Sequence, residues 1–552
     1  MQSSSALRRA TPRALPRLVL PELTEGRVVY GLTLCLYLLV ASVLVFAANI
    51  IQGDALSRVG NAEYVLYSRD PHLAAIGFVW NPLPSLLMIP LLPLKLFFPW
   101  LVERGFAANI VSAVFMAGAV YQVWRIFADL GLQRAWRLLL TALFALHPMV
   151  IFYGANGMSE APFLFFLILA TRWLASWLQA PRLECQVYAG LSLGAAYLCR
   201  YEALPAGCGA LAIVATISWM RARKHSDRPL ATAVCDTAIV AGPLVLAVAV
   251  WAVASLVIVG HPFEQFSSIY GNGSQMRTLS LQRTGQAMMT GFVQLLALQP
   301  LLIVVAVLGL LNAARLRELR VLALLAVLGP VLGFAVWANV TGAVAPWIRY
   351  FIVVIPLSSL MAGVALAGSG NEEVRRRQWH RRSVALVTTA SLLLAGFLAG
   401  AAMTNPLIAP EEGHELAFLA SGGVRTADEQ RAASRFVTER AIAAYLDGLH
   451  APEGSVLVDS FIGFPIVLSS KQPDQFVITS DRNFKQSLAD PSGTGIRYLL
   501  MPRPNGLGNL DAVNQAYPGV FASGAGIASL VEDFPNVGDG SDWRLYRVIA
   551  AN

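Results

Sequence analysis

Charged residues are scarce in this chain: Asp, Glu, Lys and Arg make up only 13% of its 552 residues, whereas 56% are apolar. A soluble globular protein carries about twice that share of charge. The net charge of +8 would suit a nucleic-acid partner, but no basic patch is interleaved with aromatic residues as such partners require. The composition therefore excludes an ordinary soluble domain and argues against nucleic-acid binding.

Cysteine is also rare, with five residues, none after Cys235 and no Cys-x-x-Cys spacing. Zinc sites and disulfide frameworks both need clustered cysteines, so neither is predicted. A phosphate-cradling glycine loop and a solenoid repeat are absent too. The lack of cysteine from the C-terminal part favours a bacterial plasma membrane.

Long apolar runs dominate what is present. A run of about 17 to 25 residues is long enough to cross the roughly 30 Å hydrocarbon core of a membrane. About eleven such runs occur, at 29–51, 106–127, 137–154, 161–180, 186–201, 203–220, 231–259, 288–311, 320–340, 346–368 and 383–402. The sequence therefore predicts a polytopic α-helical membrane protein whose transmembrane domain spans residues 29–402.

Basic residues gather in every second loop between these runs. The clusters lie at 8–17, 125–137, 182, 221–228, 315–320 and 375–382. Because basic loops stay in the cytoplasm, we expect the segment 1–28 inside and everything after about 403 outside. The first run lacks a clear cleavage site for signal peptidase, so we expect it to remain as a span.

The first outer loop, 52–105, contains a segment from Pro82 to Trp100 that is apolar enough to cross the membrane. Prolines at 82, 84, 90, 93 and 99 interrupt it. If it crossed, the basic loops would lose their alternation. We therefore expect a proline-broken helix that lies at the outer interface.

The C-terminal part, 403–552, spreads charges, glycine and proline evenly. Its patterns indicate a helix within 432–449, strands at 455–459, 476–479, 497–501 and 543–548, and helical pieces at 484–489 and 511–517. This alternation favours a small extracytoplasmic α/β domain. It shows no catalytic constellation, and our hypothesis is that it binds or orients an acceptor.

Asp54 stands just beyond the first apolar run, at the expected outer surface. A carboxylate there can hold its charge in water and still meet a lipid-borne substrate. The alternative is that Asp54 only caps the next helix and pairs with Arg58 one turn later. Glu63 and His72 follow in the same loop, where we expect a helix lying flat on the membrane with its ionisable groups clustered.

Two polar corners lie at the expected outer ends of later spans. Asn156 and Glu160 precede one span, and Glu160 either faces the cavity of Asp54 or counters a helix dipole. Arg200 and Glu202 interrupt two apolar runs at a depth where ionisable groups usually pair or line a cavity. A contact between these two is possible, although helix geometry does not favour pairs two residues apart.

Arg349 and Tyr350 repeat the arrangement of a cation and an aromatic ring near the start of the tenth run. Arg349 either grips a phosphate with its two-pronged guanidinium group or anchors the span at the interface beside Trp347. The polar loop from His261 to Arg283 is either a mobile substrate lid or a plain connector. The sequence leaves both pairs of alternatives open.

Together these features resemble the GT-C glycosyltransferases, which include the protein O-mannosyltransferases and the lipid A aminoarabinose transferases. The resemblance covers residues 29 to about 402 and rests on the order of short motifs. These are the acid after span one (Asp54), Trp80-Asn81-Pro82, Ser159-Glu160, Arg200-x-Glu202 and Arg349-Tyr350.

The resemblance implies an inverting transfer of a sugar from a polyprenyl-phosphate donor to a glycan, lipid or protein acceptor. Asp54 would be the general base, and Arg58, Arg200 and Arg349 would neutralise the departing phosphate. Ala55 stands where many relatives carry an Asp-Glu pair. This departure weakens the expectation of a divalent cation.

For that cation, Glu63, Asp70 and His72 are only speculative substitute ligands. The rival functions are a transporter or lipid flippase and an inactive scaffold of the same fold. Transporters tend to place charges at mid-bilayer in paired repeats, whereas the candidate charges here lie at one face. We therefore prefer the enzyme.

Overall fold

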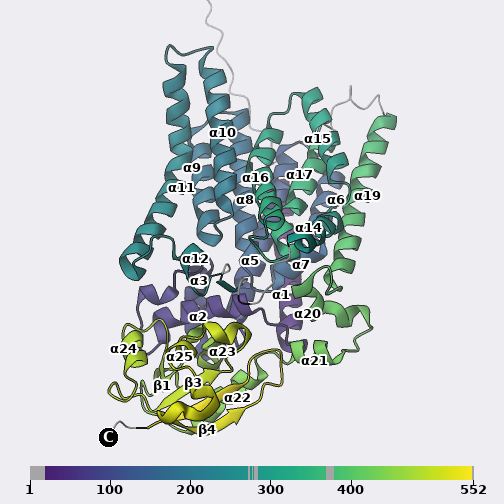
Figure 1. Ribbon diagram of the computed structural model, residues 1–552. Coiled ribbons are helices and arrows are strands. Elements are labelled where there is room, and N and C mark those ends of the chain that lie inside the picture. Colours follow the sequence, from purple (N-terminus) through teal and green to yellow (C-terminus); the bar gives the residue numbers. More distant parts are fainter. Residues whose placement is uncertain (1–18, 272–273, 276–277, 279–283, 369–377, 550–552) are drawn as a thin grey trace, which may run out of the picture.

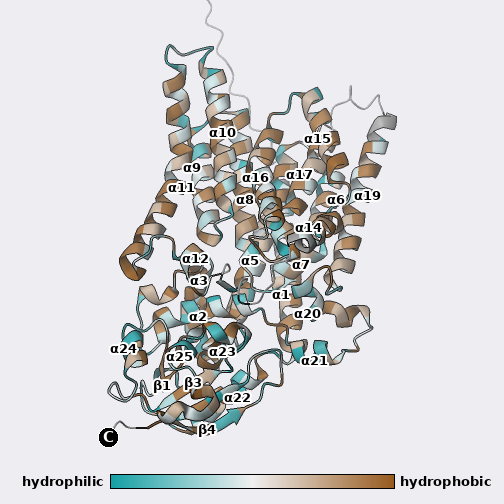
Figure 2. Ribbon diagram, in the orientation of Figure 1, coloured by the Kyte–Doolittle hydropathy of each residue, from teal (hydrophilic) through white to brown (hydrophobic). Residues whose placement is uncertain are grey.

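The computed structural model describes residues 19–271, 274–275, 278, 284–368 and 378–549. It has two parts, a bundle of helices and a smaller domain at one end of the bundle that carries the strands (Figure 1). Most of the expected segment 1–28, the basic residues 375–377 and much of the loop 272–283 lie outside the described residues. Apolar residues predominate in the bundle, and the smaller domain is mixed (Figure 2).

Eight helices of the described part are long and apolar enough to cross a membrane. They are Thr24–Ala47, made of α1 (Val19–Ser42) and the π-helical turn η1 (Val43–Ala47), α5 (Phe106–Asp129), α8 (Glu160–Gln179), α10 (Ala203–Ala222), α11 (Pro229–Val259), α16 (Arg320–Val340), Ile348–Leu366, made of η4 (Ile348–Phe351) and α17 (Val354–Leu366), and Arg382–Met403 within α19 (Gln378–Met403). The chain is a polytopic α-helical membrane protein, as the sequence predicts.

Two further apolar segments are bent pairs of helices. α6 (Arg134–Ala145) meets α7 (Pro148–Ala155) at 61°, and α14 (Thr284–Leu298) meets α15 (Leu302–Leu316) at 54°. Pro148 lies at the first bend and Pro300 at the second. Proline lacks the N–H group that would continue the helix and clashes with the preceding turn, so it accounts for both breaks.

Counting each bent pair as one span gives up to ten spans in the described residues, against the eleven runs that the sequence indicates. The remaining run is α9 (Leu183–Cys199), a helix of 17 residues. It is not among the eight single helices and two bent pairs of the described residues that qualify as spans, and it packs along α8 and α11.

The loop after the first span is built from short helices. They are α2 (Gly53–Tyr67), η2 (Leu73–Ile76), α3 (Leu83–Met88), η3 (Ile89–Leu96) and α4 (Trp100–Glu103). Prolines flank or interrupt α3, η3 and α4. The combined helix Leu83–Leu96 is too short to count as a span, and α3 lies beside α2 between the bundle and the smaller domain (Figure 1).

The C-terminal part contains a five-stranded sheet with the order β2-β1-β3-β5-β4. Its strands are β1 (Val456–Leu457), β2 (Phe476–Val477), β3 (Tyr498–Pro502), β4 (Ala528–Phe534) and β5 (Trp543–Val548). β1 pairs in parallel with β2 and β3, whereas β5 runs antiparallel to β3 and β4. Four strands match predicted runs, and β4 and its bulge were not predicted.

Helices surround this sheet and lead into it from the last span. They are α20 (Pro410–Ala420), α21 (Ala427–Ala433), α22 (Val437–Gly448), α23 (Ser460–Ser469), α24 (Phe484–Ala489), α25 (Ala512–Ala516) and α26 (Val520–Ser523). The predicted helical pieces correspond to α22, α24 and α25. The apolar helix α23 was not predicted.

The smaller domain is packed firmly against the first loop. Val456 and Val458 point into a core that is continuous with the loop and the bundle, while Leu457 between them faces a separate core, because side chains alternate along a strand. α23 packs on α2. Ion pairs between Arg69 and Asp481 at 3.0 Å add a polar tie at the same boundary.

Candidate active site

Asp54 lies in the first turn of α2, two residues after Gln52, whose extended backbone starts the helix. The helix start has no side-chain cap, so Asp54 does not act as the cap that one alternative proposed. Arg58 donates from Nη1 to the backbone oxygen of Asp54 at 3.2 Å and not to its carboxylate. The carboxylate instead accepts from Arg349, whose Nη2 lies 3.3 Å from Oδ2.

Arg349 lies in η4 at the start of a span, and its side chain is only 4% exposed. Besides Asp54, its guanidinium group reaches Glu411, with Nη1 3.0 Å from Oε1, and Glu160, with Nε 3.8 Å from Oε1. The rings of Trp347 and Tyr350 lie 4.3 and 5.8 Å from its central carbon. A side chain buried among carboxylates in this way is not a simple interfacial anchor.

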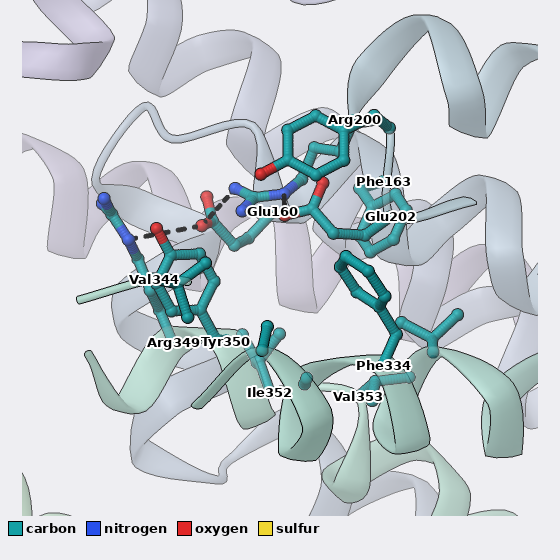
Figure 3. A pocket seen from close by; sticks show the side chains of 14 residues that line it. Glu160, Phe163, Arg200, Glu202, Phe334, Val344, Arg349, Tyr350, Ile352 and Val353 are labelled. Atoms are coloured by element: carbon teal, nitrogen blue, oxygen red, sulfur yellow. Dashed lines mark hydrogen bonds and ion pairs between the residues drawn. The ribbon is translucent and has the colours of Figure 1, made fainter. Parts of the chain in front are cut away.

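Glu160 joins this centre to a second arginine. Arg200 donates from Nη1 to Glu160 Oε1 at 2.6 Å and from Nη2 to Glu202 Oε1 at 2.7 Å. Figure 3 shows Glu160 between Arg200 and Arg349, with Tyr350 beside them. Arg200 has an extended backbone between α9 and α10, so the limit that helix geometry sets on pairs two residues apart does not apply.

Two hollows open beside these groups. One is a small hollow of about 30 Å³, lined by Glu160, Arg200, Glu202, Arg349, Tyr350 and apolar residues of α16. The larger, of about 480 Å³, has Asp54 in its wall. Its lining is mostly apolar and aromatic, with polar groups from Ser57, Asn61, His72, Tyr270 and Asp459 among them. Asp54 therefore lines the larger cavity, to which the C-terminal domain also contributes, and is linked to the small hollow through Arg349.

Several buried polar atoms of this centre have no hydrogen-bond partner. They are Glu160 Oε2, Arg349 Nε, Arg58 Nε and Glu411 Oε2. Unpaired buried polar atoms are rare and costly, and a ligand, an ion or a water can supply the missing partner. The centre thus has both acceptors and donors to offer a polar substrate.

The other predicted residues fall into different places. Arg58 is buried with its guanidinium group 5.0 Å from the ring of Trp80. Asn156 is buried and accepts from the backbone of Met158, while its Nδ2 has no partner. His72 lines the large cavity. Glu63 is not brought to the centre, because it forms an ion pair with Lys95 and lines a separate hollow.

The sequence did not reveal three acids on α20. Glu411 binds Arg349 at 3.0 Å, Glu412 accepts from Tyr153, and Glu415 accepts from Gln52 at 2.5 Å and pairs with Arg435. Burial raises the pKa of Glu411 to about 8, although Arg349 favours its charged form. The available signal was Pro410-Glu411-Glu412 soon after the last apolar run.

Metal binding has little support from the positions of the ligands. Among the described residues, no group of three or more His, Cys, Asp or Glu side chains could hold a metal ion. Asp70 pairs with Arg482 at 3.2 Å. His72 Nδ1 lies 2.6 Å from the backbone oxygen of Asp70.

No protein-family model and no curated protein matches this sequence. Its fold is similar to solved structures at low identity. One is ArnT from Cupriavidus metallidurans bound to undecaprenyl phosphate, with 13% identity, 97% of this chain and 98% of that chain covered, and a TM-score of 0.49. Another is the oligosaccharyltransferase AglB from Archaeoglobus fulgidus, bound to an inhibitory peptide and a dolichol-phosphate, with 11% identity, 88% and 70% covered, and a TM-score of 0.43.

A third similar structure is the arabinofuranosyltransferase AftD from Mycobacteria, with 16% identity, 96% of this chain and 42% of that chain covered, and a TM-score of 0.46. Transferases are what the resemblance of the sequence leads us to expect. At these identities and TM-scores the likeness is one of fold, and it carries no argument about activity. The function must follow from the geometry of the site.

Proposed function

We propose that this chain is a membrane glycosyltransferase that moves a sugar from a polyprenyl-phosphate donor to an acceptor hydroxyl, with inversion, at the outer face of the membrane. The observation that carries the proposal is the position of Asp54. It stands beyond the end of the first span, in the wall of a large cavity of mixed lining, and it pairs with Arg349, which lines the hollow that also holds Arg200. These are the two environments that a lipid phosphate and a sugar acceptor need.

In this proposal Asp54 is the general base. A hydroxyl of the acceptor, seated in the large cavity, loses its proton to the carboxylate as its oxygen bonds to the anomeric carbon of the sugar. The bond from that carbon to the phosphate oxygen breaks, and the electron pair leaves with the phosphate. Attack on the face opposite to the leaving group inverts the anomeric centre.

Arg200 and Arg349 are the groups that stabilise the departing phosphate. Negative charge grows on the phosphate oxygens as the bond breaks, and fixed guanidinium groups in a site shielded from water are most effective there. Arg349 Nε has no hydrogen-bond partner among the described residues, since Glu160 Oε1 lies 3.8 Å away, so it can donate to one of those oxygens. Arg58, buried beneath Asp54, adds positive charge on the same side.

Aromatic and neutral polar side chains suit the large cavity to a sugar-bearing acceptor. Trp80, Tyr270 and Phe461 offer ring faces, and Ser57 and Asn61 offer hydrogen-bonding groups on the same wall as Asp54. Binding sites for polar ligands commonly combine apolar surface with a few placed polar groups. The C-terminal domain contributes Phe461, so it takes part in holding the acceptor.

The test is an Asp54→Asn variant of the full chain, assayed with a panel of undecaprenyl-phosphate-linked hexoses and pentoses for release of undecaprenyl phosphate. A lost general base is expected to lower turnover by about 10² to 10⁴. Asp129→Asn is the matched control, because Asp129 also pairs with an arginine, Arg172 at 2.9 Å, but at the opposite end of α5 from the first loop. Equal turnover of the wild type and the Asp54→Asn variant would remove the mechanism.

A further inference from the structure

Three arginines from separate parts of the chain converge on the end of the first span. Arg104 donates from Nη1 to the backbone oxygen of Val45 at 3.4 Å, and Arg425 donates from Nη2 to that of Ala48 at 3.2 Å. Arg440, on α22, donates from Nη2 to the side-chain oxygen of Asn49 at 3.4 Å. All three guanidinium groups thus donate hydrogen bonds to the five-residue stretch 45–49.

The arginines of this cluster lack direct ion pairs. Within the described residues, none of the three arginines has a carboxylate within ion-pair distance, although most other arginines of the C-terminal part do. Arg440 Nη1 is buried without a hydrogen-bond partner. Burial and the nearby Arg104 lower the pKa of Arg440, while Glu103 and Glu439 act in the opposite direction.

Among the described residues, four acids lie near the cluster but outside ion-pair distance of its arginines: Glu103 and Glu439 beside Arg440, and Glu415 and Glu429 in one hollow with Arg425. Glu439 is buried and accepts from Asn536 Nδ2 at 3.1 Å. Glu103 lines the hollow that contains Lys95. Capping the carbonyl groups of the first span needs one donor for each carbonyl, whereas a guanidinium group has five N–H donors. The remaining donors are therefore in excess of what a purely structural role requires.

The cluster lies at the level where the bilayer gives way to water. The first span ends at Ala47, and Phe46 there packs on Trp100 and Phe106, with ring centroids 5.4 and 5.1 Å away. Phe97, which precedes this group, is 76% exposed. Aromatic residues of this kind gather at the headgroup level of membranes, and apolar surface beside them faces acyl chains.

We propose that Arg104, Arg425 and Arg440 form a binding site for the phosphate of an anionic phospholipid in the leaflet at this end of the bundle. The phosphodiester oxygens take the free guanidinium donors, for which the forked geometry of arginine is well suited. The acyl chains lie along Phe46 and the neighbouring apolar surface. The bound lipid joins the first span, the first loop and α22 at a point outside the two hollows at Asp54.

The experiment measures lipid retention by native mass spectrometry of the full chain released from nanodiscs that hold equal amounts of phosphatidylglycerol and phosphatidylcholine with the same acyl chains. The wild type is expected to retain phosphatidylglycerol preferentially. Each interfacial arginine favours an anionic lipid by about fivefold. The double variant Arg104→Gln, Arg440→Gln is therefore expected to lose roughly 25-fold of this preference.

Two further variants keep the result interpretable. Arg431→Gln is the matched control, because Arg431 is exposed and pairs with Asp428 on α21, and its preference should equal that of the wild type. Arg440→Lys keeps the charge and should retain most of the preference even if other variants fold poorly. No preference in the wild type, or an unchanged preference in the double variant, would overturn the proposal. Displacement of the lipid by millimolar inorganic phosphate would show a free-anion site and would overturn it too.

Discussion

The first span carries an arginine–carboxylate cluster at each end, and the two clusters differ in how completely they are paired. At the start of the span, Glu25 accepts from Arg137 at 2.8 Å and from Trp124 at 3.1 Å on one oxygen, and from Arg134 on the other. Beyond its end, Asp54 and Glu160 meet Arg349 and Arg200. The residue types are the same in both places.

Pairing in the Glu25 cluster is complete, since both oxygens of the carboxylate are used. In the Asp54 cluster, Glu160 Oε2 and Arg349 Nε remain without partners, and two hollows open beside them. A cluster that only holds helices together gains by satisfying every atom. A substrate could complete the unpaired atoms beside the cavity. Under the proposed function, the cluster at the start of the first span is therefore structural and the one beyond its end is functional.

Substitution of Arg349 should give the largest difference in activity between the Asp54 cluster and the Glu25 cluster. In Arg349→Gln the departing phosphate loses a fixed positive charge, so transfer should fall by about 10² to 10³, the loss typical for one such electrostatic group. The measurement is the initial rate of undecaprenyl phosphate release. Arg134→Gln, at the exposed arginine of the Glu25 cluster, should keep the wild-type rate. Equal losses in both variants would mean that the clusters do not differ in role.

Substitution in the Glu25 cluster should lower the stability of the protein and leave its turnover unchanged. Glu25→Gln removes the charge that holds Arg137 and weakens hydrogen bonds to charged groups, which contribute about 1.5 to 3 kcal/mol each. The thermal unfolding midpoint in detergent should fall, while the KM and kcat measured below that midpoint stay at the wild-type values. A drop in kcat of the folded variant would contradict the structural role of Glu25.

The spans could be predicted from the sequence because each apolar run must satisfy its own backbone hydrogen bonds in hydrocarbon, and it does so by forming a helix. It also placed Asp54, Glu160, Arg200 and Arg349 at the ends of spans, and the structure brings these four together. Pairing could not be predicted. A local rule paired Asp54 with Arg58, but its carboxylate meets Arg349, 295 residues away.

Elements of the C-terminal part were harder to predict for a related reason. α20 carries Glu411 into the Asp54 cluster, yet its sequence resembles the start of a soluble domain, and only its tertiary contact with Arg349 gives it a role. β4 has an irregular pattern of exposure with a bulge at Leu530 and Glu532, so it lacks the alternation that marks a strand. Glu63 shows the opposite error, since nearness in sequence to Asp54 did not bring it to the same hollow.

Glu411 gives the last test of the two clusters, because burial raises its pKa while its carboxyl group lies 3.0 Å from Arg349. Its pKa is raised by burial to about 8 in the folded chain, from 4.5 for an ordinary glutamate. The folded state therefore keeps a proton that the unfolded state has lost, and the contribution of Glu411 to the free energy of unfolding falls as the pH rises from 4.5 to about 8.

The same titration should appear in the binding of the donor. Below about pH 8 Glu411 is neutral, so Arg349 can pair with Asp54 and the donor phosphate. Above about pH 8 the Glu411 carboxylate competes with them for Arg349. We expect the KM for the donor to rise about two- to fivefold across this pH range, which matches an ion pair worth about 0.5 to 1 kcal/mol. In Glu411→Gln this rise should vanish with kcat little changed. If the rise persists in that variant, another group titrates, and Arg349 is not shared between Glu411 and the donor.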